Sequence, residues 1–122
     1  MVRILVIDDD DQIRVLLGIL LRRAGYEVVE AANGSEGLKL FRASPADLIL
    51  TDILMPEKGG LETIQEVRRD FPKVKVIALS GGFKRTENPN LPITEVLGVQ
   101  RIVTKPFAPE DLLKTVREVL AM

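Results

Sequence analysis

The sequence contains neither cysteine nor histidine. Without cysteine, the chain can form no disulfide framework, thiol nucleophile or thiolate metal site. Without histidine, it can have no Ser-His catalytic pair, no imidazole zinc site and no phosphohistidine. Any chemistry in this protein therefore depends on carboxylates, hydroxyls, lysine, arginine or a hard cation bound to oxygen.

A strong net charge and long apolar runs are absent as well. The net charge is −1 at pH 7, whereas a nucleic-acid-binding protein needs a basic face, so we expect no direct nucleic-acid partner. No apolar run approaches the roughly 20 residues of a membrane-spanning helix, and the apolar N-terminus is too short for a secretory signal. We expect a cytoplasmic protein that contacts no membrane.

The composition is that of an ordinary globular domain. The chain has 122 residues, of which 46% are hydrophobic and 29% are charged, and this length can bury a substantial core. No linker, repeat or low-complexity stretch interrupts it. We therefore expect residues 1–122 to form one domain, with no output domain after the last predicted helix.

Short apolar runs alternate with longer segments of helical periodicity. The runs predict strands at residues 4–7, 26–30, 47–51, 74–79 and 102–104. The periodicity predicts helices over residues 13–24, around 38–41, and over 61–71 and 112–120, with Pro109 in the first turn of the last. Breaks are predicted at Gly25, at Asn33-Gly34 and at Gly98. A short helix from about residue 90 or 92 to 97 is predicted in a segment containing Gly and Pro.

This alternation predicts an α/β protein with a five-stranded parallel sheet and helices on both faces, because parallel strands need crossover connections. In such sheets the functional site lies outside the carboxyl ends of the strands, at a topological switch point. The residues at these ends are Asp8 and Asp9 after the first strand, Asp52 after the third, Ser80 after the fourth and Lys105 after the fifth.

These residue types together indicate a particular chemistry. Three carboxylates brought together repel one another unless cations intervene, and Lys105 and a divalent ion are the available cations. Mg²⁺ is a suitable ion, because it takes oxygen ligands and commonly uses carboxylates together with a phosphate oxygen. A carboxylate beside a metal and an ammonium can attack phosphorus. Taken alone, each residue has an ordinary interpretation; Asp10 and Asp11 in particular are interpreted as acids that cap the following helix.

Four motifs in order resemble the receiver domains of two-component response regulators, which have a flavodoxin-like (βα)5 fold. They are Val6-Ile7-Asp8-Asp9-Asp10, Asp52-Ile53-Leu54-Met55-Pro56 followed by Gly60, Ser80-Gly81, and Lys105-Pro106-Phe107. The resemblance covers the whole chain. It implies a phosphorylation-dependent switch that is not an enzyme in the usual sense, since it catalyses only its own phosphorylation and dephosphorylation.

The resemblance also implies residue roles and partners. Asp52 would accept a phosphoryl group from a histidine kinase, a phosphotransfer protein or a small acyl phosphate. Mg²⁺ would be bound by Asp9, Asp52 and the backbone carbonyl of Leu54, and by Asp8 through water. Ser80 and Lys105 would bind the phosphoryl oxygens, and the Lys105-Pro106 peptide would be cis. Phosphorylation would reshape a face that binds an unknown downstream protein, in a monomer or a phosphorylation-dependent dimer.

One position and one segment depart from the family pattern. The switch position, three residues before the lysine, is commonly Tyr or Phe in the family, but here it is Ile102, which puts the usual aromatic coupling in doubt. The segment 81–91 contains Gly and Pro and is longer than usual. Leu54, two residues after the acceptor, offers an attacking water no hydrogen bond, so we hypothesise slow loss of phosphate.

Three other functions are conceivable for such a sequence. A phosphorylation-independent binding module on the same fold is the main alternative: the atypical switch region leaves it open, whereas the complete set of three Asp, one Ser and one Lys argues against it. A Mg²⁺-dependent phosphohydrolase would usually have a second acid where Leu54 stands. A flavin carrier would need aromatic side chains, and the chain has no Trp and only one Tyr.

Overall fold

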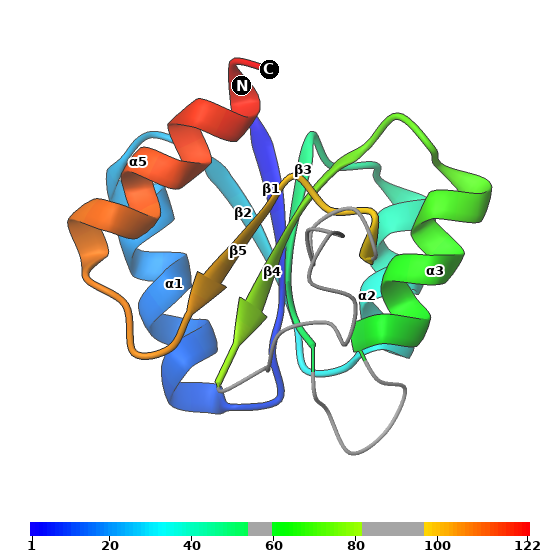
Figure 1. The fold of residues 1–122 in the computed structure, drawn as a ribbon, viewed down its shortest axis with the longest axis horizontal. Helices are drawn as coiled ribbons and strands as arrows, with labels where there is room; N and C mark the ends of the chain where they lie inside the picture. Colours follow the sequence, from blue (N-terminus) through cyan, green and yellow to red (C-terminus); the bar gives the residue numbers. More distant parts are fainter. Residues whose placement is uncertain (54–59, 82–96) are drawn as a thin grey trace, which may run out of the picture.

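The computed structural model describes residues 1–53, 60–81 and 97–122. Within them the chain forms a five-stranded parallel sheet with helices on both faces (Figure 1), as predicted. The elements are β1 (Arg3–Ile7), α1 (Asp11–Arg23), β2 (Glu27–Ala31), α2 (Gly34–Ala43), β3 (Leu48–Asp52), α3 (Gly60–Asp70), β4 (Lys75–Ser80), β5 (Arg101–Thr104) and α5 (Pro109–Leu120).

The strand order is β2-β1-β3-β4-β5. The chain leaves β1 toward β2 on one side and later enters β3 on the other, so the topological switch point lies between β1 and β3. The register pairs Ile7 with both Ala31 and Thr51 at the carboxyl ends of these strands. The first residue after β1 and the last residue of β3 therefore meet at one edge of the sheet.

The predicted strands exist, but several end one residue later than the apolar runs suggest. Asp52 and Ser80, which were expected to follow β3 and β4, are the last residues within these strands. The reason is that parallel pairing continues past the apolar residues, since Asp52 pairs with Leu79 and Ser80 pairs with Thr104. Polar side chains at these positions are thus held by the sheet and not by a loop.

The helix boundaries follow from capping. Asp10 is the N-cap of α1, and its side chain accepts hydrogen bonds from the backbone N–H groups of Gln12 and Ile13. Gly25, with a φ of 96°, follows the end of α1 as predicted. β2 ends before the predicted break at Asn33-Gly34, and the Asn33 side chain caps α2 by accepting from the N–H of Glu36.

Two apolar cores lie on opposite faces of the sheet. One packs α1 and α5 against the sheet, with Leu17, Leu21, Leu112 and Val116 among its buried side chains. The other packs α2 and α3 against the opposite face. Leu16 fits the apolar periodicity that predicted this helix, but its side chain is exposed, as are those of Val15 and Ile19.

The remaining predictions on the fold concern the segment before β5. The helix predicted to end at residue 97 lies almost entirely outside the described residues. Gly98, its predicted end, has a φ of 73°, which is the left-handed conformation that favours glycine. No helix in the described part of the chain has the length and apolarity to cross a membrane.

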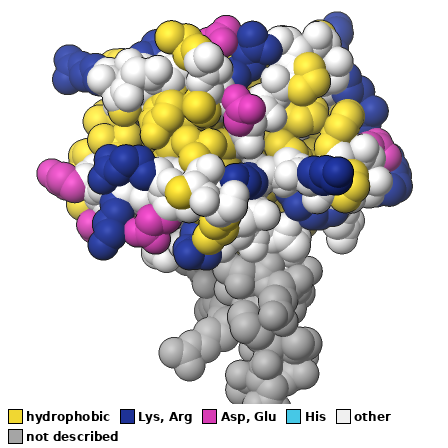
Figure 2. Space-filling model, turned by 90° about the horizontal axis from the view of Figure 1, so that it is seen from above, with side chains coloured by type: hydrophobic (Ala, Val, Ile, Leu, Met, Phe, Trp, Pro, Cys, Tyr) yellow, Lys and Arg dark blue, Asp and Glu magenta, His cyan; other side chains and the backbone are white. Residues whose placement is uncertain are grey.

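The end of the molecule seen in Figure 2 carries the N-terminal ends of the strands and both chain termini. Basic and acidic side chains are interspersed across this view, with hydrophobic side chains between them. The functional residues lie at the opposite end of the sheet.

Candidate functional site

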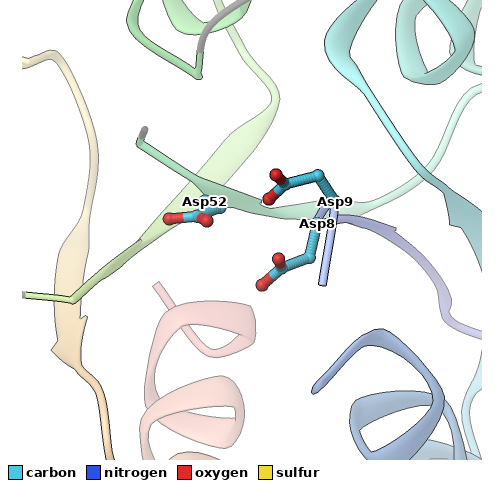
Figure 3. A group of neighbouring side chains, drawn as sticks. All are labelled: Asp8, Asp9 and Asp52. Atoms are coloured by element: carbon cyan, nitrogen blue, oxygen red, sulfur yellow. The ribbon is translucent and has the colours of Figure 1, made fainter. Parts of the chain in front are cut away.

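The side chains of Asp8, Asp9 and Asp52 converge at the carboxyl ends of β1 and β3. Each contributes a carboxylate oxygen, and these oxygens lie within 4.8 Å of one another. Figure 3 shows Asp8 and Asp9 leaving the end of β1 with their carboxylates turned to the side on which Asp52 lies. The structure thus brings together the three acids that the sequence placed at the strand ends.

Asp8 is the most constrained of these acids. Its side chain is fully buried, and its backbone N–H donates to the carbonyl of Ala31 at 3.1 Å. One carboxylate oxygen accepts from the N–H of Asp10 at 2.9 Å, and the other accepts from the Lys105 ammonium at 2.8 Å. Asp8 therefore has a fixed orientation at the edge of the sheet.

Lys105 supplies the positive charge of the site. Its Nζ lies 2.8 Å from Asp8 Oδ2 and 3.3 Å from Asp52 Oδ2, and its side chain is only 14% exposed. Burial alone would lower the pKa of Lys105, but the hydrogen bond and charge of Asp8, together with the charge of Asp52, outweigh it and raise the pKa. The side chain is therefore cationic throughout the physiological pH range.

The backbone around Lys105 is tied to the neighbouring strand. Its N–H donates to the carbonyl of Ser80 at 2.7 Å, and the Lys105-Pro106 peptide is cis, as predicted. Ser80 itself is buried at the end of β4, beside Thr104 in the register. The ends of β4 and β5 therefore form a single bonded edge that carries both Ser80 and Lys105.

Asp52 is a nearly buried acid at the end of β3. It is 8% exposed, and its backbone is closely covered by the start of α3. A Cβ atom added at Gly60 would lie 1.8 Å from the backbone oxygen of Asp52, so this position requires glycine. The hydroxyl of Thr51, also buried, donates to the same oxygen at 3.1 Å.

The donor set fits a divalent cation that prefers oxygen. Three carboxylates face one ammonium, which leaves an excess of two negative charges, the charge of one such ion. Asp9 is exposed while Asp8 and Asp52 are buried, so the ion would be reached from the Asp9 side. Leu54, the other expected ligand, lies outside the described residues.

The acids expected to have a capping role are separate from this cluster. Asp10 caps α1, and Asp11 forms an ion pair with Arg14 on the same helix. Two residues beside the site were not singled out from the sequence. In the sequence, Thr51 is simply part of the run that predicts β3. Arg14 occupies a polar position of α1, but in the structure it donates to the backbone carbonyl of Asp8 at 2.8 Å.

Relatives with this sequence pattern are signalling proteins. Residues 4–117 match the response regulator receiver domain family. The chain is 39% identical over 114 residues to the CAI-1 autoinducer sensor kinase/phosphatase CqsS of Vibrio cholerae, covering 93% of this chain and 17% of that protein. It is 37% identical over 121 residues to the probable transcriptional regulator ycf27 of Porphyridium aerugineum, covering 97% of this chain and 48% of that protein. The chain thus spans half or less of these relatives.

Solved structures share the whole architecture. The chemotaxis protein CheY4 of Vibrio cholerae has 31% sequence identity and a TM-score of 0.88, with 98% of each chain covered. The response regulator TrrA of Thermotoga maritima, solved in complex with Mg²⁺-BeF, has 34% identity and a TM-score of 0.83, with 98% of this chain and 99% of that chain covered. The matched family, the shared parallel sheet and the acids at its edge agree, and this chain belongs to the receiver domains of two-component response regulators.

Proposed function

We propose that this receiver is a phosphorylation-driven switch and that Asp52 is its phosphoryl acceptor. The observation that carries the proposal is the convergence of Asp8, Asp9, Asp52 and Lys105 at one edge of the sheet. Asp52 lies at the end of β3, a strand with a neighbour on each side. A nucleophile on such a rigid strand keeps its position while the phosphoryl group is transferred to it.

Each residue of the site has a role in this proposal. Asp9, Asp52 and the backbone carbonyl of Leu54 would bind Mg²⁺ directly, and Asp8 would bind it through water. The Mg²⁺-BeF complex of TrrA supports a Mg²⁺ site in this fold. Ser80 and Lys105 bind oxygens of the phosphoryl group. When bound, Mg²⁺ supplies positive charge that offsets the negative charge on these oxygens.

The chemical step is a transfer to a carboxylate. An oxygen of Asp52 forms a bond to phosphorus as the bond from phosphorus to the donor's nitrogen or oxygen breaks, and the donor leaves with the bonding electrons. The Lys105 ammonium, 3.3 Å from Asp52 Oδ2, stabilises the charge that remains on the transferred group. Hydrolysis of the resulting acyl phosphate by water returns the switch to its starting state. No separate metabolite is turned over.

The donor is proposed to be a histidine kinase or a histidine phosphotransfer protein that contacts the outer face of α1. Val15, Leu16 and Ile19 are large apolar side chains exposed on this face, and they line a shallow groove with Asp11 and Gln12. The groove begins one residue beyond the N-cap of α1 and so lies beside the acidic edge. A partner covering it would bring its phosphohistidine toward Asp52 while burying the apolar patch.

This assignment of the donor surface has a direct test. Leu16→Gln should slow phosphoryl transfer from a histidine kinase about tenfold, because removing one buried apolar anchor typically costs more than about 1 kcal/mol. Phosphorylation by a small acyl phosphate should remain unchanged, because that donor needs no protein surface. Equal rates with the kinase for the variant and the parent would place the donor elsewhere.

The output of the switch is proposed to differ in detail from that of relatives with an aromatic switch residue. Ile102 lies in β5 and packs, partly buried, against the core on the α2 and α3 side of the sheet. An aliphatic side chain in this place cannot exchange a ring between two orientations. Phosphorylation would therefore act on the β4-β5 edge that carries Ser80, and through it on a downstream protein. We propose that this phosphorylation takes place in the cytoplasm, where kinases obtain ATP.

Intact-mass analysis tests the proposed function. Incubation with Mg²⁺ and a small acyl phosphate should add one phosphoryl group to the parent and none to Asp52→Asn. Asp47→Asn is a matched control, because it makes the same chemical change at the residue just before β3, at the other end of the strand from Asp52, and it should be phosphorylated like the parent. No adduct on the parent, even with a kinase added, would favour the phosphorylation-independent binding module.

A further inference from the structure

Among the three acids of the site, Asp9 has the fewest contacts that hold it in place. Its side chain is exposed, and in the described part of the chain its carboxylate forms no hydrogen bond or ion pair. Asp8, in contrast, is held by Ala31, Asp10 and Lys105. The direction of the Asp9 side chain therefore depends on the backbone that carries it.

That backbone is held by Arg14. The Arg14 guanidinium donates from Nη1 to the Asp8 carbonyl at 2.8 Å. This carbonyl belongs to the Asp8-Asp9 peptide, so the hydrogen bond fixes the plane from which the Asp9 side chain leaves. The backbone of Asp8 is thus held at both of its polar groups, since the Asp8 N–H is bonded to Ala31 and the Asp8 carbonyl is bonded to Arg14.

Arg14 is itself positioned by two acids. Its Nη2 forms an ion pair with Asp11, and its Nε lies 3.9 Å from Glu30 Oε1 at the end of β2. The side chain is only 16% exposed. Arginine suits this place because its rigid fork can donate to several oxygens at once. Arg14 therefore connects the β1-α1 loop to both α1 and β2.

We propose that Arg14 is a positioning residue that orients Asp9 for Mg²⁺ through the Asp8-Asp9 peptide. This inference rests on the proposed function of the site, because it concerns how Asp9 is held for the ion. Residues that orient metal ligands commonly change metal affinity by about 10-fold to 100-fold when they are replaced. Arg14 would act on affinity without itself contacting the ion.

The sign of the effect separates this role from simple electrostatics. Removing a positive charge beside an acidic site makes the site more negative and should tighten Mg²⁺ binding. Losing the orientation of Asp9 should weaken binding instead. A weaker site in Arg14→Ala would therefore oppose the electrostatic trend, and the two explanations cannot be confused.

Arg22 provides a matched control. It lies on the same helix, pairs with the same Glu30 at 3.0 Å and donates to the carbonyl of Val28 at 3.2 Å. The contacts of its guanidinium are with β2 and do not include the β1-α1 loop. Arg22→Ala thus removes the same charge and another partner of Glu30 but leaves the Asp8 carbonyl bonded.

The experiment is titration of each protein with Mg²⁺ by calorimetry, together with urea unfolding in EDTA to compare the folds. Arg14→Ala should raise the Mg²⁺ dissociation constant about tenfold, while Arg22→Ala should change it by less than about twofold. Arg14→Lys keeps the charge and one donor and should recover part of the affinity. In acyl phosphate reactions, Arg14→Ala should need more Mg²⁺ for half-maximal rate but reach a similar maximal rate.

Three results would overturn the inference. Binding in Arg14→Ala as tight as in the parent, or tighter, would show that Asp9 needs no such support. Equal weakening in Arg14→Ala and Arg22→Ala would assign the effect to Glu30 and β2. A parent that binds no Mg²⁺ would remove the proposed metal site itself, and the inference with it.

Discussion

Asp9→Asn should stabilise the protein in the absence of divalent ions. Asp9 has a carboxylate oxygen within 4.8 Å of one from Asp8 and one from Asp52. A pair of like charges at this distance costs about 1 kcal/mol in water and about 3 kcal/mol at an effective dielectric constant near 20. Asp9 is exposed, and Lys105 offsets part of the repulsion, so we expect a gain of about 1 to 2 kcal/mol in the free energy of unfolding.

Mg²⁺ should reverse this order. The parent gains stability from any ion that binds only the folded state, about 2.7 kcal/mol when the ion is at 100 times its dissociation constant. Asp9→Asn loses a charged ligand and should gain much less. The variant should therefore be more stable than the parent in EDTA and less stable than the parent at saturating Mg²⁺.

The assay is urea unfolding followed by far-ultraviolet circular dichroism, since the chain has no Trp. Asp10→Asn is the matched control, because it removes a charge from the adjacent residue but keeps a good N-cap for α1. It should be neutral or slightly destabilising in EDTA and should respond to Mg²⁺ like the parent. The reasoning would be refuted if Asp9→Asn were no more stable than the parent in EDTA, or if Mg²⁺ stabilised both equally.

Three other changes have clear expectations. Gly60→Ala should lower the free energy of unfolding by about 3 kcal/mol, because its Cβ would lie 1.8 Å from the backbone oxygen of Asp52; unfolding within about 0.5 kcal/mol of the parent would contradict this. The pKa of Lys105 is raised in the folded protein. The stabilisation from its charge is therefore complete below the unfolded-state pKa of about 10.4, and it is lost as the pH rises through the higher folded-state pKa. Lys105→Met should therefore show a smaller loss of stability than the parent in unfolding series from about pH 8 to pH 11; an unchanged alkaline loss would refute this. Leu54→Asn should shorten the lifetime of the phosphorylated protein, measured as decay of the mass adduct; an equal or longer lifetime would contradict the slow-hydrolysis hypothesis.

The sheet was predictable from the sequence because its strands are buried on both faces. Continuous apolar runs such as those of β3 and β4 have few other interpretations in a chain with helical segments between them. The ends of the strands were less predictable. Asp52 and Ser80 are polar, so the apolar pattern stops before them, but backbone pairing with the neighbouring strand does not depend on side-chain polarity.

Local capping and exposure account for the other differences. The break at Asn33-Gly34 was predicted, but the role of the Asn33 side chain as the N-cap of α2 was not. Leu16 fits the apolar period of α1, but the inward face of the helix is narrower than the apolar stripe. Apolar residues in excess of those that pack inward can be recognised only when the packing of the helix is known. On α1 these are Val15, Leu16 and Ile19, the residues proposed to contact the donor.

The acids of the site were predictable because the carboxyl ends of parallel strands meet at one edge. Asp8, Asp9, Asp52 and Lys105 needed only the order of the elements to be brought together. Arg14 was not predictable in this way. Its contact with the Asp8 carbonyl depends on the path of the β1-α1 loop, and the only signal in the sequence is an arginine three residues after Asp11.

Trapping of the phosphoryl group at its site of attachment tests the central claim most directly. Borohydride reduces an acyl phosphate to an alcohol, so it would convert a phosphorylated aspartate to homoserine at the modified position. After incubation with Mg²⁺ and a small acyl phosphate, peptide mass spectrometry should find homoserine at residue 52 and aspartate at residues 8 and 9. Homoserine at residue 8 or 9, or aspartate at all three positions in a protein that carries the phosphoryl adduct, would contradict Asp52 as the acceptor.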